Sequence, residues 1–445
     1  MSKRESHPGS TPYPQQSGSR VPRARWWRIG TLMFLMYTVA FADRQNISVA
    51  LPSMVKDLGL SATLGGVLLS AFFWGYIATQ LPGGIVAHRI GPKRIIVGAL
   101  VLWGLMAMAT GIVNTYHELL AVRALMGLAE GVIWPAFAAM FVSWYPAAER
   151  GRAISFTSMA LPVSSIIMAP TAGWLIAAWN WHTMFIVQGL PPLVLAVLFA
   201  ILGADHPDRD RYLSSAERAY LAEHASSSRT VDGRLIDIFR SPTIWVICCA
   251  YFCWITGLYS FGLWLPSLLK QLSARGIEAV GLLSAVPFVL AAAGMFANAR
   301  WSDRSARSRT WFIAIPLVLA GTAILLQHLV RLSLFGNMVL LAIAALGLYS
   351  AFGPFWAWLL SFVPRNQAGA GTALVNLVGN FGGIVGPIVV GAAASGRKIT
   401  DGFYILGFFL LAAAAIVAML SMLTRKSTPD RVPAVATAGL LESIN

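Results

Sequence analysis

The sequence predicts an all-α membrane protein whose twelve transmembrane helices form two pseudo-symmetric halves of six. Hydrophobic residues make up 57% of the chain and charged residues only 11%, whereas average soluble domains are about 25% charged. Apolar runs of about 20 residues recur along the chain, and each is long enough to cross a hydrocarbon core of about 30 Å. A hydrophilic stretch at residues 205–241 separates six of these runs from the other six.

The apolar runs define the expected helices in chain order. They cover residues 28–50, 64–87, 93–114, 118–142, 152–178, 183–203, 242–269, 279–299, 310–330, 336–362, 367–393 and 401–424. The resulting organisation is an N-terminal tail (1–27), a first bundle (28–204), a central loop (205–241), a second bundle (242–424) and a C-terminal tail (425–445). Within the loop, Ser214 and Glu217 have capping-box spacing, which predicts a short surface helix.

The basic residues predict how the chain is oriented. With the N-terminus inside, 25 of the 33 Lys and Arg residues lie on the cytoplasmic side and the outer loops hold only 6. This distribution follows the positive-inside rule and places both termini in the cytoplasm. The net charge of +15 therefore indicates membrane orientation and contact with anionic lipid, and no nucleic-acid partner is expected.

Four charged residues lie inside predicted membrane spans. Asp43 and Arg44 interrupt the first span, and Arg123 and Glu130 lie in the fourth. A charge at the bilayer centre costs at least about 2.5–3.5 kcal/mol, so such residues mark transport pathways by default. The two opposite-sign pairs are typical of an ion-coupled carrier. The alternative is a static ion-pair network that only holds helices together.

The depths of these residues indicate a shared cavity. At about 1.5 Å per residue, Asp43 lies about 13 Å below the outer surface, Arg123 about 7 Å and Glu130 about 18 Å. A low dielectric favours the protonated form of a carboxylate, and a neighbouring guanidinium favours the ionised form. A substrate anion that draws an arginine away from its carboxylate would therefore couple proton uptake to anion binding.

The second half offers neutral polar and aromatic groups instead of charges. Asn376 and Asn380 are one helical turn apart in the glycine-rich segment 371–387. The aromatic candidates for a cavity wall are Tyr76, Tyr259, Phe355, Trp356 and Trp358. The alternative is that the asparagines bond between helices and that the aromatics pack or sit at the membrane interface.

The loops contain no P-loop, dinucleotide fingerprint, catalytic triad or zinc motif. We therefore expect a protein that is not an enzyme and that binds no cofactor and no metal. Transport would be driven by the proton gradient.

Several segments resemble the major facilitator superfamily and, within it, the anion:cation symporter family. They include FADRQNISVALP (41–52), FFWGYIATQLPGG (72–84), RALMGLAEGVIWPA (123–136) and GLYSFGLWLPSLLK (257–270). The turns at 83–94 and 299–309 echo each other with basic residues at similar offsets, as expected for related halves. The resemblance extends over nearly the whole chain.

The resemblance implies roles for particular residues. Proton coupling falls on Asp43 and Glu130, supported by Arg123, and anion binding falls on Arg44. The cavity positions are Tyr76, Asn376 and Asn380, to which the residue pattern adds Tyr259 and Trp356. The gating turns hold His88, Arg89, Arg94, Asp303 and Arg304. One departure stands out, because His88 replaces the usual acid of the first turn, whereas Asp303 keeps the acid of the second.

The combined prediction is a bacterial inner-membrane carrier with cytoplasmic termini that imports an organic anion with protons by alternating access. The fifth predicted span has Ser and Thr but no Asn or Gln, which favours a small or aromatic carboxylate over a sugar acid. The expected partners are this substrate, protons and membrane lipids, and the chain is expected to be a monomer. Two alternatives remain: a proton-antiport exporter of a drug or metabolite, and a transporter-like sensor that moves no ligand.

Overall fold

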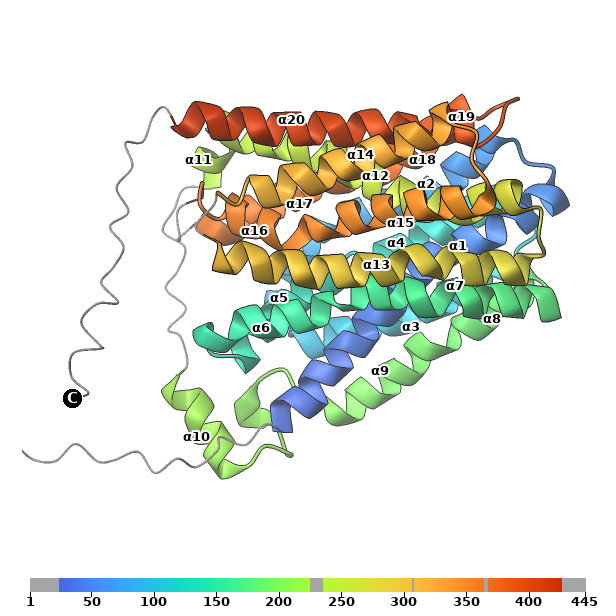
Figure 1. Ribbon diagram of the computed structural model, residues 1–445. Helices are drawn as coiled ribbons and strands as arrows, with labels where there is room; N and C mark the ends of the chain where they lie inside the picture. The colour runs from blue at the N-terminus through green and yellow to red at the C-terminus, as the bar shows by residue number, and fades with distance from the viewer. Residues whose placement is uncertain (1–23, 225–234, 306–307, 364–366, 426–445) are drawn as a thin grey trace, which may run out of the picture.

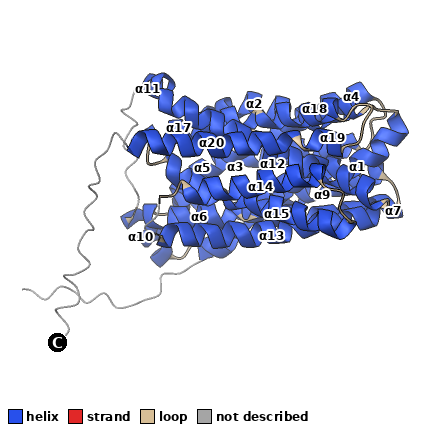
Figure 2. Ribbon diagram, turned by 45° about the horizontal axis from the view of Figure 1, so that its top comes forward, coloured by secondary structure: helices blue, strands red, loops and turns tan. Residues whose placement is uncertain are grey.

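The membrane-crossing helices of the described residues lie side by side at various tilts to one common direction (Figure 1). The computed structural model describes residues 24–224, 235–305, 308–363 and 367–425. Within these ranges every regular element is helical and no strand occurs, as Figures 1 and 2 show. The expected all-α membrane fold is confirmed.

The first half contains six membrane crossings, three of them interrupted. Its elements are η1 (Trp26–Gly30), α1 (Thr31–Leu58), α2 (Ala62–Ile90), α3 (Pro92–Thr110), α4 (Tyr116–Glu130), α5 (Ile133–Trp144), α6 (Ala147–Ser158), α7 (Ala160–Ala178), α8 (Trp181–Gln188) and α9 (Leu190–Leu202). The pairs α4–α5, α6–α7 and α8–α9 each form one span.

The second half repeats this plan after the central loop. The loop holds η2 (Pro207–Arg209), α10 (Ser215–Glu223) and α11 (Leu235–Arg240). The crossings are made by α12 (Pro242–Ser273), α13 (Ile277–Arg304), α14 (Trp311–Leu329), α15 (Leu334–Ser350), α16 (Phe352–Leu359), α17 (Ala368–Asn380), α18 (Gly382–Ala393), α19 (Thr400–Phe403) and α20 (Ile405–Arg425). Eleven spans in the described residues are long and apolar enough to cross a membrane, and the more polar α1 makes the twelfth crossing.

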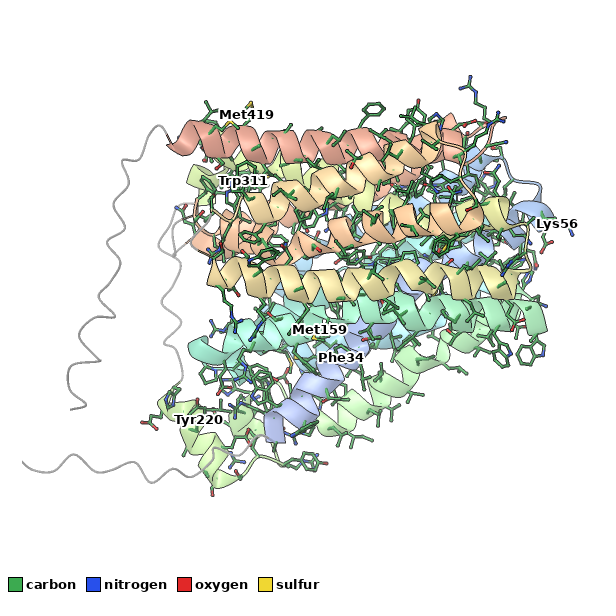
Figure 3. All side chains as sticks on the ribbon, in the orientation of Figure 1. Phe34, Lys56, Met159, Tyr220, Trp311 and Met419 are labelled. Atoms are coloured by element: carbon green, nitrogen blue, oxygen red, sulfur yellow. The ribbon has the colours of Figure 1, made fainter. Side chains whose placement is uncertain are left out.

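The bundle has two distinct ends. We call the end where α10 and α11 lie the basal end and the opposite one the apical end (Figure 1). Figure 3 labels Tyr220 of α10 at the basal end and Lys56 of α1 at the apical end. Helix α1 starts at the basal end and ends at the apical end. Each following crossing runs in the opposite direction to the one before it (Figure 1).

The two halves touch closely at the apical end. A Cβ atom added to Gly66 of α2 would collide with the Pro387 carbonyl of α18. A Cβ on Gly173 of α7 would lie 2.9 Å from the Ile277 carbonyl oxygen of α13. Glycine lets these backbones approach closely, so the apical ends of the two halves are packed against each other.

The central loop is attached to the first half by buried charges. Arg25 bonds to Glu149 at 2.6 Å and Glu217 at 2.7 Å, and Arg28 bonds to Asp210 at 2.6 Å. We call these five residues the basal ion-pair cluster. Burial lowers the pKa of the Arg25 guanidinium, but the hydrogen bonds and the negative charges of Glu149 and Glu217 together outweigh burial, so that the pKa is raised.

The short helix predicted in the central loop is present as α10. The Ser214 hydroxyl accepts a hydrogen bond from the Glu217 backbone N–H at 3.1 Å and caps the helix as expected. The Glu217 side chain is fully buried against Arg25. It therefore serves the basal ion-pair cluster instead of completing a capping box.

Candidate functional site

The central ion pair runs between helices. Arg44 on α1 donates from Nη2 to Oε1 of Glu130 on α4. Only 3% of the Arg44 side chain and 1% of the Glu130 side chain are exposed. The pairing therefore crosses from α1 to α4, the two helices whose charges were expected to face one cavity. A pair sealed from water interacts more strongly than a surface pair, and separating it leaves an uncompensated charge.

The fourth membrane crossing is interrupted immediately after Glu130. Helix α4 ends at Glu130, and α5 begins at Ile133 after a short turn. A Cβ atom on Gly127 would collide with the Phe72 carbonyl, and one on Gly75 would collide with the Ala124 carbonyl. These glycines let α2 and α4 pack backbone to backbone, and this packing fixes the position of Glu130.

Asp43 has a separate environment from Glu130. Its Oδ2 accepts a hydrogen bond from Trp103 Nε1 at 3.0 Å, and its Oδ1 accepts one from Asn46 Nδ2 at 3.2 Å. The residue is 1% exposed, and no described cation lies within ion-pair distance of its carboxylate. The site thus holds two buried carboxylates, one with a cationic partner and one with neutral donors.

Arg123 binds backbone instead of a carboxylate. Its Nη1 donates to the Asp43 carbonyl at 3.2 Å and its Nη2 to the Arg44 carbonyl at 3.3 Å. The residue is completely buried. Arg123 therefore joins α4 to α1 where α1 carries its two charges, and its positive charge lies close to both carboxylates.

A chain of hydrogen bonds leads from Arg44 to the second half and back. Arg44 Nη1 donates to Tyr259 Oη at 3.2 Å, and Tyr259 Oη donates to Asn380 Oδ1 at 3.2 Å. Asn380 Nδ2 then donates to Gln80 Oε1 at 3.1 Å. The chain connects α1, α12, α17 and α2, so the arginine of the first half is bonded directly to the second half.

Aromatic rings surround the Arg44 guanidinium. Its Cζ lies 4.4 Å from the Phe41 ring centre, 4.6 Å from that of Tyr76 and 5.1 Å from that of Phe72. Ring faces attract a cation and exclude water at the same time. Tyr76, which was predicted to line the cavity, contacts the arginine through its ring.

Two predicted cavity residues lie outside this hydrogen-bonded chain. Trp356 is half-buried and packs on the Tyr251 ring with centroids 5.1 Å apart. Asn376 is half-buried one turn before Asn380, and the chain of described hydrogen bonds passes through Asn380 alone. The structure brings together Asp43, Arg44, Arg123, Glu130, Tyr76, Tyr259 and Asn380.

The predicted gating residues lie at the basal end. Arg89, Arg94, Asp303 and Arg304 are all exposed, and none forms an ion pair with another described residue. The backbone of His88 belongs to α2, but its side chain lies outside the described part of the protein.

Sequence reasoning missed several polar residues of the site. Gln80 lies one turn after Tyr76 in an otherwise apolar stretch of α2, which was a usable signal. Gln45 follows Arg44 directly, and its Oε1 accepts a hydrogen bond from Ser165 Oγ on α7 at 2.9 Å. Trp103 could not be found from sequence, because an indole in an apolar helix has the same pattern as a packing residue.

A buried arginine–glutamate pair and a second buried carboxylate lie inside the first half of a twelve-helix membrane bundle, an arrangement typical of a membrane transporter. The chain belongs to the Major Facilitator Superfamily, whose family profile matches residues 33–387. It is therefore a multi-pass membrane transporter and not an enzyme.

Two named transporters are similar to this chain over most of its length. An Agrobacterium vitis protein named for tartrate transport is 30% identical over 431 residues, covering 93% of each chain. This likeness confirms the expected resemblance to organic-anion carriers. A quinolone resistance transporter of Acinetobacter baumannii is 26% identical, covering 88% of this chain and 92% of the relative.

A solved structure shares the fold. It is a bacterial homologue of the human lysosomal transporter Spinster in an inward-facing, unoccupied conformation, with a TM-score of 0.76 and 18% identity. The match covers 93% of this chain and 100% of that one. At this identity the likeness concerns the fold alone.

Proposed function

We propose that this protein imports a small organic anion together with protons by alternating access. The observation that carries the proposal is the pairing of Arg44. This buried guanidinium is bonded to one carboxylate, and its other arm reaches into the second half. A guanidinium offers a planar donor fork that matches a carboxylate, so a substrate carboxylate can take the place of Glu130.

Displacement of Glu130 provides the coupling. Once the substrate binds Arg44, Glu130 loses its cationic partner inside a buried site, and a buried carboxylate without a partner takes up a proton. Release of the anion restores the pair and expels that proton. Asp43, already held by neutral donors, is the second proton-carrying group, and Arg123 stabilises both carboxylates in their ionised state.

The orientation and substrate class complete the proposal. We assign the basal end to the cytoplasm of a bacterial inner membrane, because most of the Lys and Arg residues that the structure describes lie at that end. The tartrate-named relative supports a small carboxylate as substrate. The chain acts as a monomer, since the proposed site is complete within one copy. The gating residues His88, Arg89, Arg94, Asp303 and Arg304 control the basal opening, and Trp356 and Asn376 contact the substrate during the cycle.

The carboxylate roles are tested in proteoliposomes with radiolabelled tartrate. Glu130→Gln should abolish uptake driven by a pH gradient but leave counterflow exchange intact, because the neutral amide mimics the protonated acid. Asp43→Asn should do the same. Glu278→Gln, which removes an exposed acid at the start of α13, should behave like the unaltered protein. Normal accumulation by both site variants would refute the coupling role.

The anion-binding role of Arg44 is tested by direct binding. Arg44→Ala should abolish tartrate binding, measured by calorimetry on the purified protein, whereas removal of an exposed arginine by Arg331→Ala should not. A screen of carboxylates by thermal shift extends the test if tartrate does not bind the unaltered protein. Retained affinity for the same anion in Arg44→Ala would overturn the assignment.

Export is the second candidate function, and the quinolone-resistance relative favours it. The two directions are separated in vesicles of defined orientation. Import predicts that the anion accumulates when the proton gradient points inward from the apical side. Proton antiport predicts that quinolone moves in the opposite direction to the protons, toward the apical side. Binding of either compound without net flux would indicate a sensor.

A further inference from the structure

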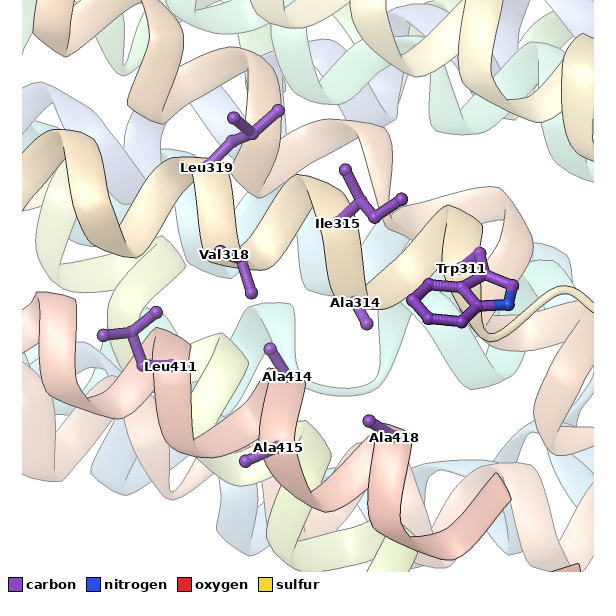
Figure 4. A pocket seen from close by; sticks show the side chains of 9 residues that line it. All are labelled: Trp311, Ala314, Ile315, Val318, Leu319, Leu411, Ala414, Ala415 and Ala418. Carbon is purple, nitrogen blue, oxygen red and sulfur yellow. The ribbon is translucent and has the colours of Figure 1, made fainter. Parts of the chain in front are cut away.

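A groove opens between α14 and α20 on the outer surface of the second half. Its volume is about 350 Å³. Its walls include Ala314 and Val318 of α14 and Leu411, Ala414, Ala415 and Ala418 of α20. Figure 4 shows these side chains facing the space between the two helices, with the Trp311 ring at one end.

The shape of the groove follows from the residues along the two helices. Gly321 and Gly407 make the close contact, because a Cβ on either would lie 2.9 Å from the carbonyl oxygen of the other. From there α14 and α20 diverge toward the basal end, as Figure 1 shows. Alanine at positions 414, 415 and 418 does not fill the widening space. The result is a wedge that is closed toward the apical end.

The lining determines what can occupy this wedge. All of its wall residues are apolar apart from the Trp311 indole, so a water molecule there would lack the hydrogen-bond partners it needs. The groove lies between two membrane-crossing helices, where the surrounding medium is lipid. Trp311 is 50% exposed at the basal end of α14, in the position of an interfacial tryptophan.

Basic residues lie at the basal ends of α14 and α13. Arg309 is exposed two residues before Trp311, and Arg300 and Arg304 are exposed in the last turns of α13. The end of α13 is held against the start of α14, because Asn298 Nδ2 donates to the Phe312 carbonyl at 2.8 Å. Asp303 is the one acidic residue among the described residues of segment 299–312.

We propose that this wedge binds an anionic phospholipid of the basal leaflet. One acyl chain fills the space beside the α20 alanines, and the phosphate is held by Arg309 with the charges of Arg300 and Arg304 nearby. The apolar wall accepts any acyl chain, so the arginines supply the preference for an anionic headgroup. Basic positions between membrane helices at one leaflet are suited to such headgroups. This inference does not depend on the proposed substrate or coupling.

The experiment measures lipid binding to the purified full-length protein by native mass spectrometry. Dioleoyl phosphatidylglycerol and dioleoyl phosphatidylethanolamine are titrated separately, and the anionic phosphatidylglycerol should bind more tightly. Arg309→Ala should weaken its binding about fivefold, the effect expected for one basic residue at a membrane surface, whereas Arg309→Lys should retain it. Arg331→Ala, at the opposite end of α14, is the matched control and should leave binding unchanged.

A second variant tests the acyl chain separately from the headgroup. Ala415→Phe should fill the wedge and reduce binding of both lipids, whereas Val197→Phe, at a residue of α9 that is 59% exposed, should not. Equal binding of the two lipids to the unaltered protein would overturn the proposal. So would unchanged phosphatidylglycerol binding in both Arg309→Ala and Ala415→Phe. A dimer lost specifically in Ala415→Phe would assign the wedge to a second copy instead.

Discussion

Arg123 shows how a buried charge can act through the backbone. Its two arms bind consecutive carbonyls of α1, those of Asp43 and Arg44. An arginine fork can span two such acceptors at once, and its charge strengthens both bonds. The residue therefore positions Asp43 and Arg44, the proposed coupling carboxylate and the proposed anion-binding arginine, without forming an ion pair with either side chain.

Replacement of Arg123 tests this positioning role. Arg123→Met keeps an apolar stem but removes both charged donors, so we expect a loss of about 2–4 kcal/mol in stability and a lower unfolding temperature. Arg123→Lys should recover part of the loss, because one ammonium can bond to one carbonyl well. Thermal unfolding in detergent measures both, with Arg331→Met as the exposed control. An unchanged unfolding temperature in Arg123→Met would contradict the role.

At the scale of elements, the central loop is part of the first half. Helix α10 is held through Glu217, which is fully buried against Arg25. Tyr220 of the same helix donates to Glu149 at 3.1 Å, and burial together with this hydrogen bond raises the pKa of its phenol. The segment between α9 and α10 is joined to α3 as well, since Asp205 accepts a hydrogen bond from the Lys93 backbone N–H at 2.8 Å. These contacts join the basal ends of several helices of one half.

Glu217→Gln should release α10. Removal of one partner from a buried ion pair costs about 3–5 kcal/mol, and Glu149 remains to hold Arg25, so we expect the lower end of this range. The expected result is faster cleavage of the central loop by added protease and a lower unfolding temperature. Glu223→Gln changes an exposed acid of the same helix and serves as the matched control. Equal cleavage rates for the two variants would show that the ion pair does not hold α10.

At the scale of the whole molecule, the two halves are closed at the apical end. Backbone contacts between α2 and α18 and between α7 and α13 need glycine at their closest points. The Arg44–Tyr259–Asn380–Gln80 chain lies between the same halves. An alternating-access carrier must break and remake both kinds of contact in each cycle.

Gly66→Val should prevent apical closure. Overpacking costs about 1–3 kcal/mol, which lowers the ratio of the closed to the open state by a factor of about 5 to 150. We expect uptake and counterflow to fall together while the protein still folds and binds its substrate from the apical side. Gly98→Val is the control, because a Cβ at Gly98 meets nothing within 4 Å. Full transport activity in Gly66→Val would show that the apical contact is not part of the cycle.

The sequence by itself determined that this is a membrane protein, that it crosses the membrane twelve times and which charged residues lie inside the crossings, where they cost free energy. Hydrophobic length and charge depletion act locally, so they can be read from composition along the chain. The same holds for the intramembrane positions of Asp43, Arg44, Arg123 and Glu130, because a charge in an apolar run is visible without a fold.

Only the tertiary structure decided which of these residues meet. The pairing of Arg44 with Glu130, the bonding of Arg123 to backbone carbonyls and the contact of Trp103 with Asp43 all join separate helices. Helix periodicity gives the face on which a residue lies but not the rotation and height of the neighbouring helix. Those are set by backbone contacts such as Gly75 with Ala124, which arise from packing summed over whole helices.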